Sequence, residues 1–154
     1  MVKNWKISER RDLPESQVIA LYQSVGWSCA QRPEQLLAGL ANSHQLLSAW
    51  NGEQLIGLGN SISDGHLVVY FPHLLVHSDY QNQMLGQELF ARLREPYADF
   101  HQQVLVADPD AVAFYRKCGF VTADGCRAMW VYPDREKYAQ GESEIRVEMP
   151  TPPD

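Results

Sequence analysis

The sequence predicts an α+β fold, in which helices precede and follow a run of antiparallel strands. Apolar residues gather over 45–50, 54–58 and 66–76, and the pairs Asn51-Gly52 and Asp64-Gly65 separate these three segments. Asn-Gly or Asp-Gly between apolar runs is a strong local signal of a β-hairpin, because the turn residues take positive φ. Apolar residues recur at helical spacing on both sides of the run. The predicted order is β, α, α, β, β, β, α, β, α, β, which differs from the strict alternation of a doubly wound sheet.

One short strand and two helices are predicted before the hairpins. The strand covers 5–8. Apolar side chains from Val18 to Val25 then recur at helical spacing, and Gly26 is suited to end that helix. The second helix begins at Pro33, because proline is favoured in the first helical turn.

After the hairpins the pattern changes back to helical spacing. Pro72 lies inside the third hairpin strand, where it removes a ladder donor and predicts a bulge or a break. A helix follows Asp79 and stops at Pro96. The fully apolar segment 104–107 predicts a short buried strand, and Asp108-Pro109 begins another helix.

The length of the chain, 154 residues, predicts a single domain. We expect this domain to span 1–140, with its last strand over 127–132. Residues 141–154 end in Pro-Thr-Pro-Pro-Asp and are expected to form a C-terminal tail, with 145–149 as a candidate short strand.

The composition excludes several classes of protein. Hydrophobic residues make up 45% and charged residues 21%, which argues against a disordered or fibrous chain. The formal net charge of −6 disfavours nucleic-acid binding, which needs a basic face. No apolar stretch approaches the ~18 residues of a membrane helix, and the first residues lack an apolar leader. We therefore expect a cytoplasmic protein that binds neither nucleic acid nor membrane.

No metal or disulfide site is predicted. Cys29, Cys118 and Cys126 are odd in number and show no Cys-x-x-Cys spacing. His73 and His77 would lie roughly 13 Å apart on a strand, at ~3.3 Å per residue, which is too far for one ion.

Segment 76–89 predicts a strand that runs through a tight loop into a helix, with Gly86 where the helix begins. Unpaired N–H groups at such a helix start favour an anion, usually phosphate. An ordinary strand-to-helix turn explains these residues equally well.

Segment 108–120 carries a second pattern, Ala-x-x-Phe-Tyr-x-Lys-x-Gly-Phe. Ala111 and Phe114 lie one helical turn apart, so a thin apolar ligand could contact that face, with the Tyr115 hydroxyl nearby. Taken alone, aromatic residues at helical spacing are more often part of a core.

The two segments together, about twenty residues apart, resemble the GNAT acyltransferase superfamily. The resemblance covers about 5–132. It implies a three-layer form of the α+β fold, with a mixed, mostly antiparallel central sheet, helices on both faces and a splayed strand pair. It also implies acetyl-CoA as co-substrate and an amine as acceptor. Dimers are common among such relatives, so a homodimer is a candidate state.

The resemblance also implies residue roles at the cofactor. Free backbone groups of the splayed strand would pair with the pantetheine arm, the following loop would hold the pyrophosphate, and the later helix would line the cofactor's path. In this order, the implied cofactor-binding residues are Leu74, Leu75, Val76, Gln81, Asn82, Gln83, Met84, Leu85, Gly86, Asp108, Ala111, Phe114 and Lys117. One departure stands out: Met84 replaces the first glycine of the loop pattern. Glycine allows positive φ and close approach to phosphate, whereas methionine does neither easily.

For catalysis, the resemblance places the general acid at Tyr115, which is protonated at neutral pH because free tyrosine titrates near ~10. A strand amide around Leu75 would stabilise the oxyanion. His73 lies where relatives often carry an acidic residue, and an unperturbed pKa near ~6.5 suits a general base. A surface histidine beside a bulge is an equal alternative.

Three residues are candidates for the acceptor pocket: Trp27, Asp64 and Tyr70. For Asp64, a structural role in its Asp-Gly turn is the slightly favoured alternative. The sequence thus predicts an N-acetyltransferase that moves acetyl from acetyl-CoA directly to a primary amine of a small molecule or polypeptide. The alternative is a non-catalytic module of the same fold that binds acyl-CoA or a protein.

Overall fold

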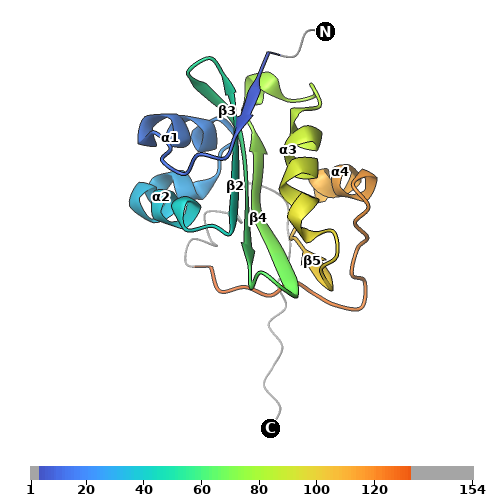
Figure 1. The fold of residues 1–154 in the computed structure, drawn as a ribbon. Coiled ribbons are helices and arrows are strands. Elements are labelled where there is room, and N and C mark those ends of the chain that lie inside the picture. The colour runs from blue at the N-terminus through green and yellow to red at the C-terminus, as the bar shows by residue number, and fades with distance from the viewer. Residues whose placement is uncertain (1–3, 133–154) are drawn as a thin grey trace. The chain divides into compact units, whose positions relative to one another are not determined.

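The computed structural model describes residues 4–132, of which 4–122 belong to one compact unit. This unit holds a five-stranded sheet of order β1-β2-β3-β4-β5 (Figure 1). The strands are β1 (Lys6–Ser8), β2 (Gln45–Asn51), β3 (Gln54–Ser63), β4 (Val68–Val76) and β5 (Gln102–Val104). The first four pair antiparallel, and β4 pairs parallel with β5. The predicted mixed, mostly antiparallel sheet is confirmed.

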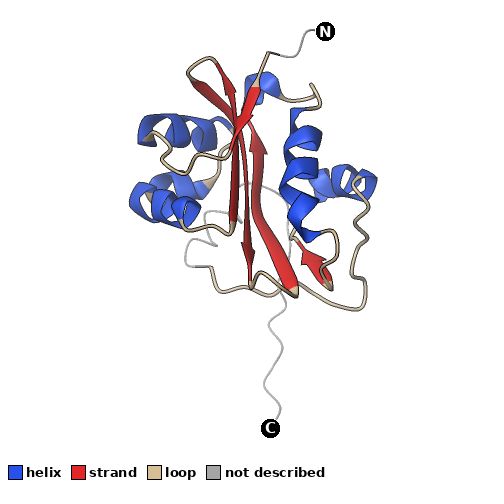
Figure 2. Cartoon of the chain, in the orientation of Figure 1, coloured by secondary structure: helices blue, strands red, loops and turns tan. Residues whose placement is uncertain are grey.

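Helices cover both faces of this sheet (Figure 2). On one face lie α1 (Glu15–Ser24) and α2 (Pro33–Ala41), and on the other α3 (Leu85–Arg94) and α4 (Val112–Lys117). Short 3₁₀ turns η1 (Ser28–Gln31), η2 (Ser78–Tyr80), η3 (Glu95–Tyr97) and η4 (Pro109–Ala111) connect them. The three layers predicted from the resemblance are therefore present.

Each face of the sheet has its own apolar core. The α1 and α2 side chains Val18, Leu21, Tyr22, Leu36 and Leu40 are buried against β2, β3 and β4. On the other face, α3 buries Leu85, Leu89, Phe90 and Leu93. Gly57 permits this second contact, because a Cβ there would lie 2.8 Å from Leu89 Cδ1. Glycine in β3 therefore lets α3 pack closely on the sheet.

The predicted irregularity at Pro72 is a bulge in β4. The pairing of β4 with β3 shifts between Asn60 and Ile62, where β4 contains one extra residue. Before the bulge, Val69 and Phe71 face α3; after it, Leu74 and Val76 do. Because a bulge shifts the alternation of a strand by one residue, it turns His73 and Leu75 toward α1 and α2.

Asn60 supports this bulge from within β3. Its side chain is 4% exposed, accepts from the His73 backbone N–H at 3.1 Å and donates to Ser43 Oγ at 2.9 Å. We expect Asn60→Ala to lower the free energy of unfolding by about 1–3 kcal/mol, because the His73 amide loses its acceptor in a poorly hydrated position. Urea denaturation measures the loss. Asn42→Ala is the control, since exposed Asn42 only donates to Ala38 O at 2.8 Å; an equal loss there would contradict the assigned role.

The pairing of β4 with β5 is short. It joins Val68, Val69 and Tyr70 to 102–104 and then stops, although β4 continues for six more residues. The splayed pair expected from the resemblance is thus present at the C-terminal half of β4. The strand predicted at 104–107 is instead β5, Gln102–Val104. Its pairing with β4 ends at Val104, the residue at which the apolar run begins.

One predicted strand is wrong. Residues 127–132 form no strand; they belong to a second unit that begins at residue 123. A short run of apolar side chains does not by itself make a strand, because a strand also needs a partner edge. The candidate strand at 145–149, the domain boundary at 140 and the tail 141–154 lie outside the described residues.

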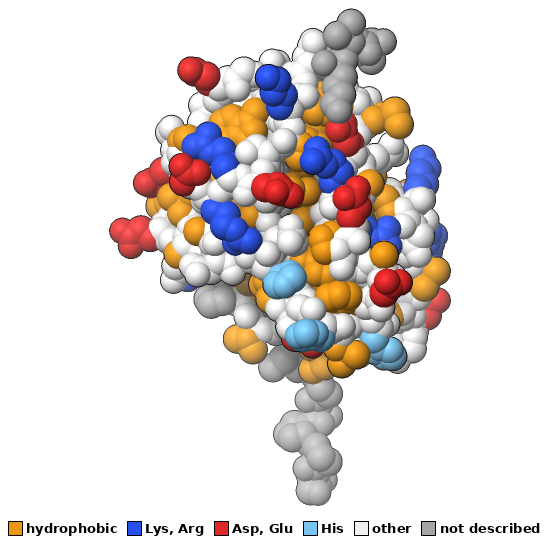
Figure 3. Space-filling model, viewed as in Figure 1, with side chains coloured by type: hydrophobic (Ala, Val, Ile, Leu, Met, Phe, Trp, Pro, Cys, Tyr) orange, Lys and Arg blue, Asp and Glu red, His pale blue; other side chains and the backbone are white. Residues whose placement is uncertain are grey.

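Within residues 4–132, no helix is long and apolar enough to cross a membrane, and no group of three or more metal-ligating side chains occurs. All three cysteines are free thiols. On the face shown in Figure 3, basic and acidic side chains are interspersed rather than gathered into a basic stripe.

Candidate active site

A cavity of about 580 Å³ lies on the α3 side of the sheet, along the part of β4 that extends beyond its pairing with β5. Its wall combines the end of β4, the loop that follows, the start of α3 and the inner face of α4. It is lined by Leu74, Leu75, Val76, Tyr80, Gln81, Asn82, Met84, Leu85, Gly86, Gln87, Ala111, Phe114, Tyr115 and Lys117. The two motifs of the sequence, about twenty residues apart, therefore meet in one cavity.

The backbone of β4 directs polar groups that have no partner strand to this cavity. In an antiparallel ladder, alternate residues direct their N–H and C=O to the same neighbour. The amides of His73 and His77 bond toward β3, to Asn60 Oδ1 and to Ile56 O. The backbone N–H and C=O of Leu75 therefore also point toward β3, whereas those of Leu74 and Val76 point away from β3, toward the open side. Of the strand amides around Leu75 that the sequence suggested as oxyanion donors, those of Leu74 and Val76 are the ones directed to the cavity.

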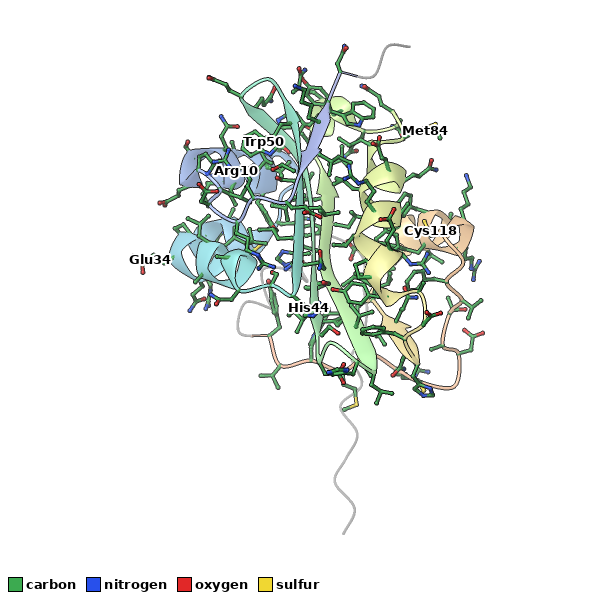
Figure 4. All side chains as sticks on the ribbon, in the orientation of Figure 1. Arg10, Glu34, His44, Trp50, Met84 and Cys118 are labelled. Atoms are coloured by element: carbon green, nitrogen blue, oxygen red, sulfur yellow. The ribbon has the colours of Figure 1, made fainter. Side chains whose placement is uncertain are left out.

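The loop between β4 and α3 contains two non-glycine residues in the left-handed region, Asn82 with φ 62° and Met84 with φ 70°. This backbone differs from an ordinary helical entry. Met84 is the N-cap of α3, and its side chain is 71% exposed at the N-terminal end of that helix (Figure 4). The methionine thus adopts the conformation that glycine favours in the family loop, without filling the cavity.

The start of α3 offers an anion site. The first helical bond runs from Glu88 N to Met84 O, so the preceding amides of Leu85, Gly86 and Gln87 have no partner within the helix. All three residues line the cavity, and Lys117 adds a positive charge to its wall. Helix N-terminal amides with a nearby cation favour a phosphate group.

We expect Met84→Gly to raise the free energy of unfolding by up to about 1 kcal/mol. A left-handed residue with a Cβ is strained by ~1–2 kcal/mol, and the greater freedom of glycine in the unfolded chain offsets part of the gain. Thermal unfolding measures the change. Gln83→Gly, one residue earlier and outside the positive-φ set, is the control and should not stabilise. A loss of stability in Met84→Gly would show that the thioether makes a contact that outweighs the strain.

Tyr115 lies in the cavity wall, packed against Phe90 and Phe114 with ring centroids 5.4 and 5.1 Å away. Burial, with smaller contributions from Cys118 and Asp108, raises its pKa to about 12. No described residue hydrogen-bonds its hydroxyl. A protonated hydroxyl in the cavity, without a hydrogen-bond partner in the described part of the chain, is suited to donate a proton to a bound group.

His73 lies on the opposite face of β4, in a cluster with two aromatic rings. Its Nδ1 is 2.7 Å from Tyr22 Oη, and its ring centroid is 5.4 Å from that of Trp27. Burial lowers its pKa to about 4. The ring is therefore neutral at pH 7 and is not a surface histidine. Two predicted residues, His73 and Trp27, are brought together here.

The remaining predicted residues lie apart from the cavity. Asp64 Oδ1 accepts from the backbone N–H groups of His66, Leu67 and Val68 at 2.8–3.2 Å, which lowers the pKa of Asp64 to about 2. A structural role of Asp64 in the Asp64-Gly65 turn accounts for these contacts. Tyr70 is 38% exposed on β4 beside the bulge.

Two predicted cofactor residues, Gln83 and Asp108, do not line the cavity. Gln83 Nε2 donates to Asp79 O at 3.5 Å. Asp108 precedes η4 as its N-cap residue, without a side-chain cap bond, and lies close enough to influence Tyr115.

Sequence reasoning missed three residues. Tyr80 and Gln87 line the cavity, and both fall inside the segment 76–89 that the sequence singled out. Tyr22, which contacts His73, was assigned only to the apolar face of its helix; no local signal distinguishes a buried hydroxyl that has a distant partner from a simple core ring.

Residues 19–128 match a family model described as an acetyltransferase (GNAT) domain. Among curated proteins, an uncharacterized N-acetyltransferase, ycf52, of Gracilaria tenuistipitata var. liui is 33% identical over 121 residues, covering 73% of this chain and 65% of the relative. A histone acetyltransferase, TAP1, of Glycine max is 32% identical over 130 residues, covering 75% of this chain and 55% of the relative. The chain thus spans less than two thirds of the length of each.

Among solved structures, a GNAT family acetyltransferase from Streptococcus pneumoniae TIGR4 aligns with a TM-score of 0.73 and 28% identity. The alignment covers 84% of this chain and 98% of that one. A putative acetyltransferase from Deinococcus radiodurans R1 gives the same TM-score at 26% identity, covering 84% of this chain and 89% of that one.

Proposed function

The chain belongs to the GNAT acetyltransferase family, and from that membership we propose that it transfers acetyl from acetyl-CoA directly to a primary amine of a small molecule or polypeptide. One observation carries the proposal: the Tyr115 hydroxyl, the unpaired groups of β4 and the N-terminal amides of α3 share one cavity.

The cavity suits a molecule with an anionic end and a thin polar arm. The amides of Leu85 and Gly86, together with Lys117, would hold the pyrophosphate. The backbone groups of Leu74 and Val76 would pair with the amides of the pantetheine arm, as a further strand pairs with a sheet edge. Ala111 and Phe114 form the apolar wall beside that arm. The Val76 carbonyl also accepts from Gln81 Nε2 at 3.1 Å, so that side chain must turn away or share the acceptor.

The transfer needs three events. The nitrogen lone pair of the neutral amine attacks the thioester carbonyl carbon, and the carbonyl oxygen gains negative charge. An N–H donor on β4 stabilises that charge; such a donor is worth ~2.7–4 kcal/mol. The C–S bond then breaks, its electron pair stays on sulfur, and Tyr115 donates a proton to the thiolate. The nitrogen loses its extra proton to solvent, and amide and free thiol result.

The acceptor would approach from the face of α1, where Trp27 and His73 lie. Because β4 and β5 separate after Tyr70, the sheet is open between the cavity and this face. The name of the Glycine max relative describes a histone acetyltransferase, which supports including polypeptide amines among the acceptors to be tested.

The test combines binding and turnover. Acetyl-CoA should raise the unfolding temperature in a concentration-dependent way. Free thiol should then appear when amines are added, including lysine peptides and aminated sugars. Absence of stabilisation at millimolar acetyl-CoA would overturn the enzyme proposal. Stabilisation without thiol release on any amine would leave a non-catalytic acyl-CoA-binding module in its place.

A further inference from the structure

The contact between Tyr22 and His73 determines which of the two side chains donates the hydrogen bond. Tyr22 is fully buried in α1, and among described residues the only hydrogen-bond partner of its hydroxyl is His73 Nδ1, at 2.7 Å. A tyrosine hydroxyl carries one hydrogen, and a buried hydrogen needs an acceptor. Among the described residues, the only acceptor in contact with this hydroxyl is the Nδ1 lone pair. Tyr22 must therefore donate, and His73 Nδ1 must be unprotonated.

The surroundings keep His73 neutral. The ring packs edge-on against Tyr22 and Trp27, with centroids 5.4 Å away in both cases, and burial lowers its pKa. Burial is the cause of this shift, and no charged group among the described residues contributes to it. Two nearby groups that could ionise are Tyr22 in α1 and Cys29 in η1. Burial raises the pKa of both, so neither carries charge at pH 7. On β3, the neighbouring side chain is the uncharged Asn60.

A neutral imidazole with an unprotonated Nδ1 carries its hydrogen on Nε2. No described residue bonds Nε2. From this geometry we infer that Tyr22 is a positioning residue that holds His73 as the Nε2–H tautomer, so that in acetyl transfer the Nε2 group of His73 is a hydrogen-bond donor and not the base. The role in transfer rests on the proposed function; the tautomer does not. The donor role replaces the general-base role that the sequence suggested for His73, because a protonated Nε2 has no lone pair to receive a proton.

The tautomer can be measured on the free protein. With [¹⁵N]histidine labelling, long-range ¹H–¹⁵N correlations distinguish a protonated Nε2 from a protonated Nδ1. Between pH 5.5 and 8 we expect His73 to show a protonated Nε2 and an unprotonated Nδ1, without titration. A protonated Nδ1, or a ring that titrates in this range, would overturn the inference.

Tyr22→Phe removes the donor. The hydrogen bond favours the neutral ring, so its loss should raise the pKa of His73 by up to about one pH unit and release the fixed tautomer. Tyr97→Phe is the matched control. Tyr97 is also fully buried and contacts His44 Nδ1 at 2.6 Å, but its hydroxyl has a second partner, Ser61 Oγ, also at 2.6 Å. This control should leave the His73 signals in place; unchanged signals in Tyr22→Phe as well would contradict the assigned role.

The donor role is tested by two substitutions of His73. Gln has an N–H at a similar reach and an oxygen that can accept from Tyr22, but it cannot act as a base. We expect His73→Ala to lower kcat/KM for the amine roughly 10- to 100-fold, the range for losing one hydrogen bond to a substrate, and His73→Gln to recover at least a tenfold part of that loss. Equal losses in both variants would restore the base and reject the donor. If no amine is acetylated by the wild-type protein, the proposed function fails while the measured tautomer still decides the structural inference.

Discussion

Tyr115→Phe should lower kcat roughly 100- to 10,000-fold, the usual contribution of a positioned general acid, and leave the KM for acetyl-CoA nearly unchanged. The ring keeps its packing against Phe90 and Phe114, because only the hydroxyl is removed. That hydroxyl has no partner among the described residues, so stability should change little. Steady-state thiol release, with acetyl-CoA varied at saturating amine, measures both constants.

Tyr80→Phe is the matched control, because Tyr80 lines the same cavity. Its hydroxyl is already bonded, accepting from Asn51 Nδ2 at 2.8 Å and donating to Gln54 Oε1 at 3.3 Å. Its kcat should fall at least ten times less than that of Tyr115→Phe. Equal falls in kcat and in cofactor affinity for Tyr115→Phe would mean that this tyrosine is structural.

The pH dependence adds an independent check of Tyr115. Because burial raises its pKa to about 12, the hydroxyl stays protonated at pH 10 and below. Its ionisation should therefore produce no loss of kcat near pH 10, where free tyrosine titrates. A loss of kcat near pH 10 that disappears in Tyr115→Phe would show that the group is more hydrated than its packing indicates.

The sequence predicted the sheet and the helices where local chemistry dominates. The Asn51-Gly52 and Asp64-Gly65 turns placed three strands in series, and Pro33 marked the start of α2. Pro72 predicted the bulge because the cause, a missing N–H, is local. The prediction of a strand at 127–132 was wrong because its outcome depends on distant residues. The segment has a strand-like composition, but a strand also needs a partner edge, which no single-sequence pattern supplies.

The same distinction holds for the candidate site. The candidate cofactor residues were brought together by a resemblance, and the structure places all of them except Gln83 and Asp108 in the wall of one cavity. The environment of His73 was not predictable, because its Tyr22 partner lies 51 residues earlier in the chain. The orientation of the Leu74, Leu75 and Val76 backbone was also missed, since it depends on the register of β4 with β3.

Substitution of Gly86 by a large residue is the second change for which we expect a large loss of kcat/KM. A Cβ built there would lie 3.6 Å from Val76 Cγ2 and 3.7 Å from Phe114 Cε2, which is ordinary contact. Gly86→Ala should therefore fold normally and gain up to about 1 kcal/mol of helix stability. A longer side chain has to enter the space between β4 and α4. Gly86→Leu should then lower kcat/KM for acetyl-CoA roughly 10- to 100-fold, if displacing it costs the 1–3 kcal/mol typical of overpacking.

Gly39→Leu separates this effect from a general change in helix stability. Gly39 is an exposed helical glycine in α2, on the other face of the sheet, and a Cβ there would meet no atom within 4 Å. Its kcat/KM should stay at the wild-type value. If Gly86→Leu keeps wild-type kcat/KM for acetyl-CoA, the pantetheine arm cannot pass between Val76 and Phe114. If Gly86→Leu loses cofactor affinity while its unfolding temperature holds, the loss comes from occupation of the cavity, because a damaged fold would lower both.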